Sequence, residues 1–171
     1  IPFEVYTFVE NNVCHENGLK HNDLYIYDFH LVNIFSSRMS ATEFVEAGSI
    51  LTNLVRWPQL CPHWMRMSGT PLNETIIASF DIIPEFQKKY NLQIVNTVFL
   101  TDGEGHTLPK NYYNEDTKTF CQRSVSNYFK KCYMYVCDPV TKQQELVKNP
   151  NSGRNLSSAL IKLLKYRTGC N

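Results

Sequence analysis

One short run of β-branched and apolar residues constrains the fold of this 171-residue chain more than any other feature. It is Thr97-Val98-Phe99-Leu100, the end of a predicted strand over residues 92–100, and such nearly continuous apolar character is typical of a strand covered on both faces. Predicted strands also alternate with predicted helices along the chain. The pattern therefore favours an α/β fold with a three-layer sheet and helices on both faces.

The remaining elements follow from side-chain periodicity and from capping residues. In the first half of the chain we expect a strand over 3–9, one long strand or two short ones over 24–35, and a helix over 41–55 capped by Ser40. A helix from Pro71 that Pro84 kinks or splits, the strand over 92–100 and an irregular stretch to about 116 follow. The chain then continues with a hairpin over 133–137 and 143–147 and a helix with an apolar stripe from Leu156 to Leu164 that ends before Gly169.

Two short polar motifs carry the chemistry that the sequence offers. Thr70 is predicted to cap the helix that begins at Pro71, and Asp102 follows the strand that ends at Leu100. Ligands of open α/β sheets gather beyond the carboxyl ends of the strands, and Mg²⁺ prefers oxygen ligands and keeps several waters. Each motif alone is a common cap or turn, but the two together predict a shared cation site.

The same residues resemble a known family. The segment 68–72 (Ser-Gly-Thr-Pro-Leu), followed about thirty residues later by 99–103 (Phe-Leu-Thr-Asp-Gly), looks like the second and third ligand motifs of von Willebrand factor A (VWA) domains. The resemblance implies a Rossmann-like sheet with a metal-ion-dependent adhesion site (MIDAS). It makes Thr70 the second-loop ligand, Asp102 the third-loop ligand through water, and Ser68 a further metal-site residue that shapes the second loop.

Within that family the chain is most similar to VWA domains of the cobalt-chelatase CobT-like type, which occur in phages and bacteria. That similarity implies a hexameric MoxR-type AAA+ ATPase as the protein partner. It also implies a metal-ion-dependent protein-interaction module or chelatase accessory subunit, with hydrolysis left to the ATPase rather than to this chain.

The chain departs from the family at its start. The first family motif, Asp-x-Ser-x-Ser, is not matched ahead of Phe3, where the chain has already reached what resembles the second strand. We therefore expect residues 1–171 to form a single, partial VWA-like domain, an internal segment of a longer protein, without the central first strand and the last strand. Two ligand loops instead of three predict weak Mg²⁺ binding or none.

Other functions stay open at this point. One alternative is a viral structural or assembly protein with an inactive metal site. Another is a metallohydrolase that uses Asp102, Glu104 and His106. A zinc site is a third, although its Cys and His residues match no standard zinc spacing; these residues are Cys14, His15, His21, Cys61 and His63.

Composition narrows the partners and the compartment. The net charge is +1, from 17 Lys and Arg against 16 Asp and Glu, so no broad field favours nucleic acid. No apolar run reaches about 18 residues, which predicts no membrane span. The six cysteines form no C-x-x-C pair and fit free thiols of a reducing cytoplasm better than three secreted disulfides. We expect a cytoplasmic protein, in an infected host cell or in a virion if the origin is viral.

Overall fold

The fold combines α-helices with small antiparallel strand pairs. The structure is a computed structural model that describes residues 1–10, 20–60, 62, 69–123 and 133–171. The elements of these residues are β1 (Glu4–Glu10), β2 (Phe29–Ser36), α1 (Ala41–Arg56), the 3-10 helix η1 (Pro58–Leu60), α2 (Leu72–Tyr90), β3 (Lys110–Asn114), β4 (Thr119–Arg123), β5 (Met134–Cys137), β6 (Gln144–Val147) and α3 (Gly153–Thr168). Among them we find no helix with the length and apolar character that a membrane span requires.

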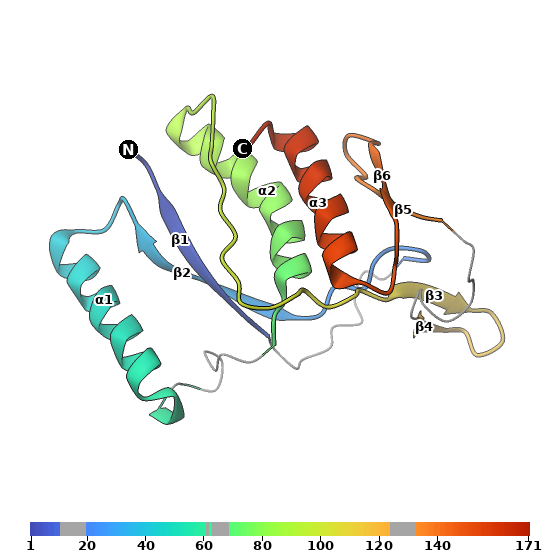
Figure 1. Cartoon of the computed structure of the whole chain (residues 1–171), viewed down its shortest axis with the longest axis horizontal. Helices are drawn as coiled ribbons and strands as arrows, with labels where there is room; N and C mark the ends of the chain where they lie inside the picture. The colour runs from blue at the N-terminus through green and yellow to red at the C-terminus, as the bar shows by residue number, and fades with distance from the viewer. Residues whose placement is uncertain (11–19, 61, 63–68, 124–132) are drawn as a thin grey trace.

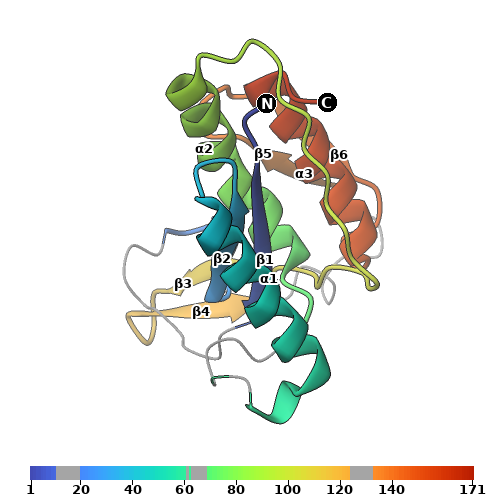
Figure 2. The ribbon, with the colours of Figure 1, turned by 90° about the vertical axis from the view of Figure 1, so that its left-hand side faces the viewer.

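Helices lie on both sides of the β1–β2 sheet. The two strands pair antiparallel over their full length, with an irregularity between Val5 and Tyr6. Figures 1 and 2 show this sheet between α1 on one side and the α2–α3 pair on the other. The described strands form three separate two-stranded sheets, β1–β2, β3–β4 and β5–β6, and not one continuous sheet. The predicted mixture of helices and strands is therefore confirmed, but one three-layer sheet is not formed by the described strands.

The hydrophobic core lies between α2, α3 and the strands beside them. Ile76 on α2 and Leu163 and Leu164 on α3 are almost fully buried, as the predicted apolar stripes require. Phe8 of β1 and Val95 and Phe99 of the segment after α2 pack against the same core. The helix predicted before Gly169 is confirmed as α3, and Gly169 caps its end with a φ of +65°.

The helix α1 is held mainly by its own caps and by β2. Ser40 and Glu43 form a reciprocal capping box: the Ser40 amide donates to Glu43 (2.7 Å), and the Glu43 amide donates to the Ser40 hydroxyl (3.3 Å). The rings of Phe35 on β2 and Phe44 on α1 lie 4.8 Å apart. The predicted helix over 41–55 is confirmed, yet none of its residues is buried.

Two details of α2 differ from the sequence prediction. Pro71, not Thr70, is the N-cap residue, so the Thr70 hydroxyl is not a helix cap. Pro84 lies inside a helix that continues to Tyr90 and does not split it. The burial of Phe80 and Ile83 in the core on the preceding turn outweighs the backbone hydrogen bond that a proline removes.

Two other segments also differ from expectation. Residues 92–100 run extended beside the helices, and two backbone hydrogen bonds join Val95 and Thr97 to Asn171. The segment pairs with none of the described strands, so the predicted strand is wrong as a member of a sheet. The stretch after Gly103, predicted to be irregular, contains β3, which pairs with β4. The Tyr113 and Phe120 rings, 5.1 Å apart across this pair, and a left-handed Lys118 in its turn stabilise that hairpin.

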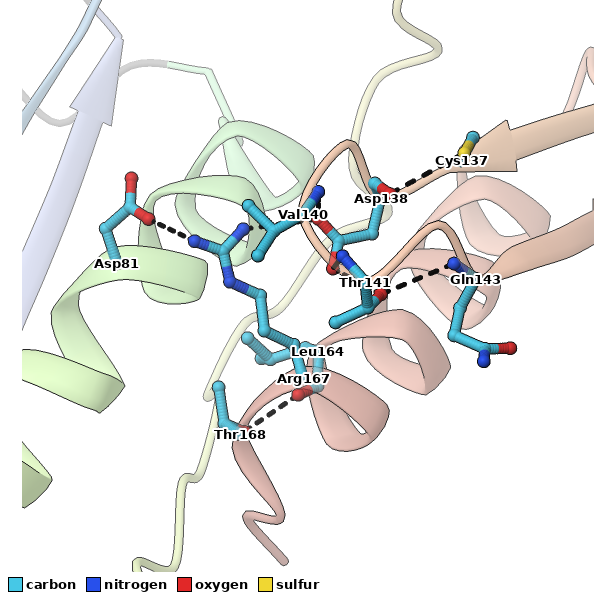
Figure 3. A network of polar contacts seen from close by, with 9 residues as sticks. All are labelled: Asp81, Cys137, Asp138, Val140, Thr141, Gln143, Leu164, Arg167 and Thr168. Atoms are coloured by element: carbon cyan, nitrogen blue, oxygen red, sulfur yellow. Dashed lines mark hydrogen bonds and ion pairs between the residues drawn. The ribbon is translucent and has the colours of Figure 1, made fainter.

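A polar network ties the confirmed β5–β6 hairpin to both core helices (Figure 3). The Asp138 carboxylate lies in the hairpin turn and accepts hydrogen bonds from the Thr141 hydroxyl (2.6 Å) and from the backbone amides of Val140 and Thr141 (3.1 and 3.2 Å). Arg167 of α3 donates to Asp138 (3.2 Å) and to Asp81 of α2 (2.7 Å). One guanidinium thus joins three elements.

Candidate functional site

The first turn of α2 is entered through a glycine that no other residue can easily replace. Gly69 has a φ of +68°, the left-handed region that favours glycine. A β-carbon at Gly69 would also collide with the side chain of Glu10, the last residue of β1. The carboxylate of Glu10 therefore lies directly against the turn that leads into α2.

The structure brings Thr70 and the Asp102 loop together, as the sequence predicts. A β-carbon placed on Gly103 would lie 3.2 Å from the Thr70 hydroxyl oxygen, so the backbone next to Asp102 passes beside Thr70. The Thr101 hydroxyl holds this loop, because it donates to the Gly103 carbonyl (3.1 Å) and accepts from the Gly103 amide (3.2 Å). Asp102 is exposed at the tip. Ser68, the third predicted metal-site residue, lies outside the described residues.

Buried amide and hydroxyl groups fix the loop after Asp102 to the helices. The Asn73 side-chain amide on α2 donates to the His106 carbonyl (2.6 Å), and the Ser157 hydroxyl on α3 donates to the Asn73 side-chain oxygen (2.7 Å). Gly105 is buried beside Asn73, and a β-carbon on Gly153 would overlap the carbonyl oxygen of Gly105. The start of α3 thus presses this loop against the start of α2.

Glu74 is an unsatisfied carboxyl group beneath this surface. Its residue is 2% exposed, and its Oε2 atom has no hydrogen-bond partner among the described residues. Burial raises the pKa of Glu74 above its ordinary value of 4.5, the charge of Glu10 raises it further, and His106 opposes the shift. Two carboxyl groups and an imidazole therefore influence one another around the entry to α2.

Replacing this carboxyl group should stabilise the chain at neutral pH. A raised folded-state pKa means that wild-type stability is fully present below the ordinary pKa of about 4.5 and declines as the pH rises toward the folded-state pKa. Glu74→Gln does not titrate, so we expect it to exceed the wild type by about 1 kcal/mol near pH 8 and to lose that advantage near pH 4. Urea denaturation without divalent cations at both pH values measures the difference.

The matched control is Glu85→Gln, an exposed carboxyl group on the same helix. It should stay within about 0.5 kcal/mol of the wild type at both pH values, because surface substitutions rarely change stability more. An equal gain in both variants would mean that burial of Glu74 is not the cause.

These side chains form what we term the α2-entry cluster: Glu10, Thr70, Glu74, Asp102 and His106. Carboxylate and hydroxyl oxygens are suitable ligands for Mg²⁺, and the orphaned oxygen of Glu74 is a buried acceptor without a donor. Within the described ranges, however, no group of three or more His, Cys, Asp and Glu side chains is arranged to hold a metal ion. The donor set fits a divalent cation only with the Thr70 hydroxyl and water among the ligands.

The other candidates from the sequence have different surroundings. Glu104 forms an ion pair with Arg154 (2.9 Å), so its carboxylate already has a partner. His21 accepts a hydrogen bond from the Tyr113 amide (3.1 Å) through Nδ1. The remaining predicted zinc ligands, Cys14, His15, Cys61 and His63, lie outside the described residues. The described cysteines, Cys121, Cys137 and Cys170, are free thiols.

Three members of this region were not predicted from the sequence: Glu10, Asn73 and Glu74. The signal for Glu10 was present, since it ends the strand β1 just as Asp102 follows the strand-like segment 92–100. The signal for Glu74 was its place in the first turn of α2, four residues after Thr70 and hence one helical turn away. The role of Asn73 depends on contacts with His106 and Ser157, distant in sequence, which no local pattern indicates.

Comparisons with protein-family models, with curated proteins and with solved structures give no match to this chain.

Proposed function

We propose that this chain is a metal-assisted protein-interaction module of the VWA type, and not itself an enzyme. Thr70 and Asp102 supply its metal ligands, Asp102 through water, and Ser68 is the further metal-site residue of the proposal. The bound cation takes a carboxylate from a protein partner as a further ligand. Such a module docks or couples its partner, and the chemical work is left to that partner.

One observation carries this proposal: the Thr70 hydroxyl oxygen lies 3.2 Å from the position of a β-carbon on Gly103, next to Asp102. The two motifs are about thirty residues apart in sequence, yet they meet at the start of α2. The positive end of the α2 dipole adds to the attraction for carboxylates at this place. The carboxylate of Glu10, which lies against Gly69, adds negative charge that favours a cation over an anion.

The architecture that accompanies this function is a three-layer Rossmann-like sheet, of which this chain forms part. The order α1, β1–β2 sheet, α2–α3 pair is compatible with that architecture (Figure 2). The extended segment 92–100 would then be a further strand of the middle layer. In the same proposal the partner is a MoxR-type AAA+ ATPase, as in cobalt-chelatase-like systems.

Magnesium binding is expected to be weak and to depend on Asp102. With few protein oxygens in the cluster, most ligands of the ion stay water, so we expect a Kd on the order of 1 mM. Asp102→Ala removes the exposed carboxylate and should weaken binding at least about tenfold. Isothermal calorimetry with MgCl₂ on the 171-residue chain measures both values.

Glu104→Gln is the matched control for this experiment. It removes a carboxylate from the same loop, but one that is already paired with Arg154. It should leave the Mg²⁺ affinity within about twofold of the wild type. Tight stoichiometric binding would contradict the expected weakness, and an unchanged affinity in Asp102→Ala would remove this carboxylate from the site.

A second candidate is a structural or assembly role without a metal. The exposed apolar residues of the segment 92–100, among them Val98 and Leu100, favour it. Partner binding that persists in EDTA and in Asp102→Ala would support this candidate over the first.

A further inference from the structure

The side chain of Glu10 lies against Gly69 along its whole length. An ideal β-carbon on Gly69 would be 3.0 Å from the Cβ atom of Glu10 and 2.8 Å from its Cδ atom, and it would overlap the Oε2 atom. There is room for this contact because Gly69 has no side chain. The carboxylate of Glu10 is therefore held beside the residue that precedes Thr70.

The main chain fixes the place of this carboxylate. Glu10 is the last residue of β1 and is paired with Phe29 of β2 in the strand ladder. Figure 1 shows that the end of β1 meets the start of α2. The loop that carries Asp102 reaches the same place, since Gly103 passes beside the Thr70 hydroxyl. Three segments that are distant in sequence thus bring oxygen-bearing side chains to one end of α2.

Basic side chains do not balance the negative charge at this place. In the part of the chain that the structure describes, neither Glu10 nor Asp102 forms an ion pair with a Lys, Arg or His side chain. Glu74 adds a third carboxyl group, whose pKa is raised first by burial and then by the charge of Glu10. Carboxylates that are drawn together in this way are stabilised by a paired or coordinated cation.

The unsatisfied oxygen of Glu74 is independent evidence for a ligand. The residue is 2% exposed, and its Oε2 atom has no hydrogen-bond donor among the described residues. Buried polar atoms normally have a partner. Mg²⁺ keeps several of its waters, and such waters are donors. A hydrated cation at the start of α2 would therefore supply a donor that the described protein groups do not.

We propose that Glu10 is a further protein ligand of the divalent cation, together with Thr70 and Asp102. The inference rests on the proposed metal site and adds to it a carboxylate from the end of β1. Glu10 binds the ion directly, and Glu74 accepts a hydrogen bond from one of the waters on the ion. Water completes the ligand set, which agrees with the weak binding expected for this site.

Glu10→Gln tests the assignment, because the amide keeps the size of the side chain but removes its charge and one carboxylate oxygen. We expect the Mg²⁺ affinity, measured by calorimetry on the 171-residue chain, to fall at least about tenfold. Glu10→Asp keeps the charge but withdraws the carboxylate by one methylene group, so it should also weaken binding, by at least about fivefold. Far-ultraviolet circular dichroism checks that both variants are folded.

Glu46→Gln is the matched control for the loss of charge. Glu46 is an exposed carboxyl group on α1, and solvent and salt screen its charge. The variant lowers the negative charge of the chain as much as Glu10→Gln does. It should leave the Mg²⁺ affinity within about twofold of the wild type.

Paramagnetic broadening by Mn²⁺ locates the ion by NMR without a substitution. Mn²⁺ takes the same oxygen ligands as Mg²⁺. Substoichiometric MnCl₂ should broaden the amide signals of Glu10, Thr70 and Gly103 in the wild type. The amide signal of Gly169, about 24 Å away at the other end of α3, should stay sharp. In Glu10→Gln the same broadening should need at least about tenfold more MnCl₂.

The results that contradict this assignment differ from those that contradict the metal site itself. If Asp102→Ala loses affinity but Glu10→Gln does not, or if Mn²⁺ broadens Thr70 but not Glu10, the site exists without Glu10. If Glu10→Asp binds as tightly as the wild type and Glu10→Gln does not, the charge of Glu10 acts at a distance and Glu10 is not a ligand. If Mn²⁺ broadens none of these signals, the proposed metal site is wrong and this inference is wrong with it.

Discussion

Asp138→Ala should destabilise the chain by about 3 kcal/mol, the largest effect we expect from a single substitution outside the apolar core. The Asp138 side chain is fully buried, at 0% exposure, and it satisfies Arg167, the Thr141 hydroxyl and two backbone amides of the hairpin turn (Figure 3). Its removal leaves these donors without their acceptor in a buried place. Urea denaturation monitored by far-ultraviolet circular dichroism measures the loss.

Asp81→Ala is the matched control, because Asp81 pairs with the same guanidinium of Arg167. The Asp81 side chain is 77% exposed, so water and salt screen its interaction, and we expect a loss below about 0.5 kcal/mol. If the two variants lose equal stability, the buried turn is not what makes Asp138 important.

The same carboxylate predicts a loss of stability in acid. Burial by itself raises the pKa of Asp138, but hydrogen bonds from Thr141 and Val140 and the charge of Arg167 outweigh it and hold the pKa below the ordinary value of 3.8. This contribution is therefore present above about pH 4 and is lost as the pH falls through the folded-state pKa. The stability gap between the wild type and Asp138→Ala should narrow from about pH 5 to about pH 3. The pH dependence of stability that Asp138 causes is opposite in sign to that of Glu74, whose pKa is raised.

The helices could be predicted because their signals are local. Ser40 and Glu43 are three residues apart and form the box that starts α1. Gly169 follows the apolar stripe of α3 and ends the helix. In both cases the deciding residues lie within two helical turns of the end that they define, so the sequence contained the information.

Strand pairing could not be predicted in the same way. The apolar run that ends at Leu100 indicated a strand covered on both faces. The segment is extended, but one face is exposed at Val98 and Leu100, and its hydrogen bonds go to Asn171, which is distant in sequence. The reverse error occurred after Gly103, where β3 was missed. Tyr112 and Tyr113 are good strand formers, but nearby Gly, Pro and Asn residues masked their signal.

The candidate site was predicted in part, for a related reason. Thr70 and Asp102 stand at the ends of a predicted helix and a predicted strand, and general rules for α/β folds place such ends together. Glu74 is buried, whereas a charged residue is expected at the surface. Its burial follows from the packing of the 103–106 loop on α2, which becomes known only with the fold.

Gly153→Ala should destabilise the chain by about 1–3 kcal/mol and disturb the α2-entry cluster at the same time. A β-carbon on Gly153 would overlap the carbonyl oxygen of Gly105, and backbone cannot move aside as a flexible side chain can. The start of α3 or the 103–106 loop must then shift. The loop shift would separate Gly103 from Thr70, so Mg²⁺ affinity measured by calorimetry should fall together with stability measured in urea.

Gly48→Ala makes the same chemical change where the structure has room for it. Gly48 lies in the interior of α1 and a β-carbon there meets no atom within 4 Å, so the better helix propensity of alanine should raise stability by about 0.5–1 kcal/mol. Stability changes of opposite sign in the two variants are the critical result, because both variants replace glycine with alanine in a helix. If Gly153→Ala is as stable as the wild type and binds Mg²⁺ equally well, the close approach of α3 to the Gly105 loop does not hold the site in place.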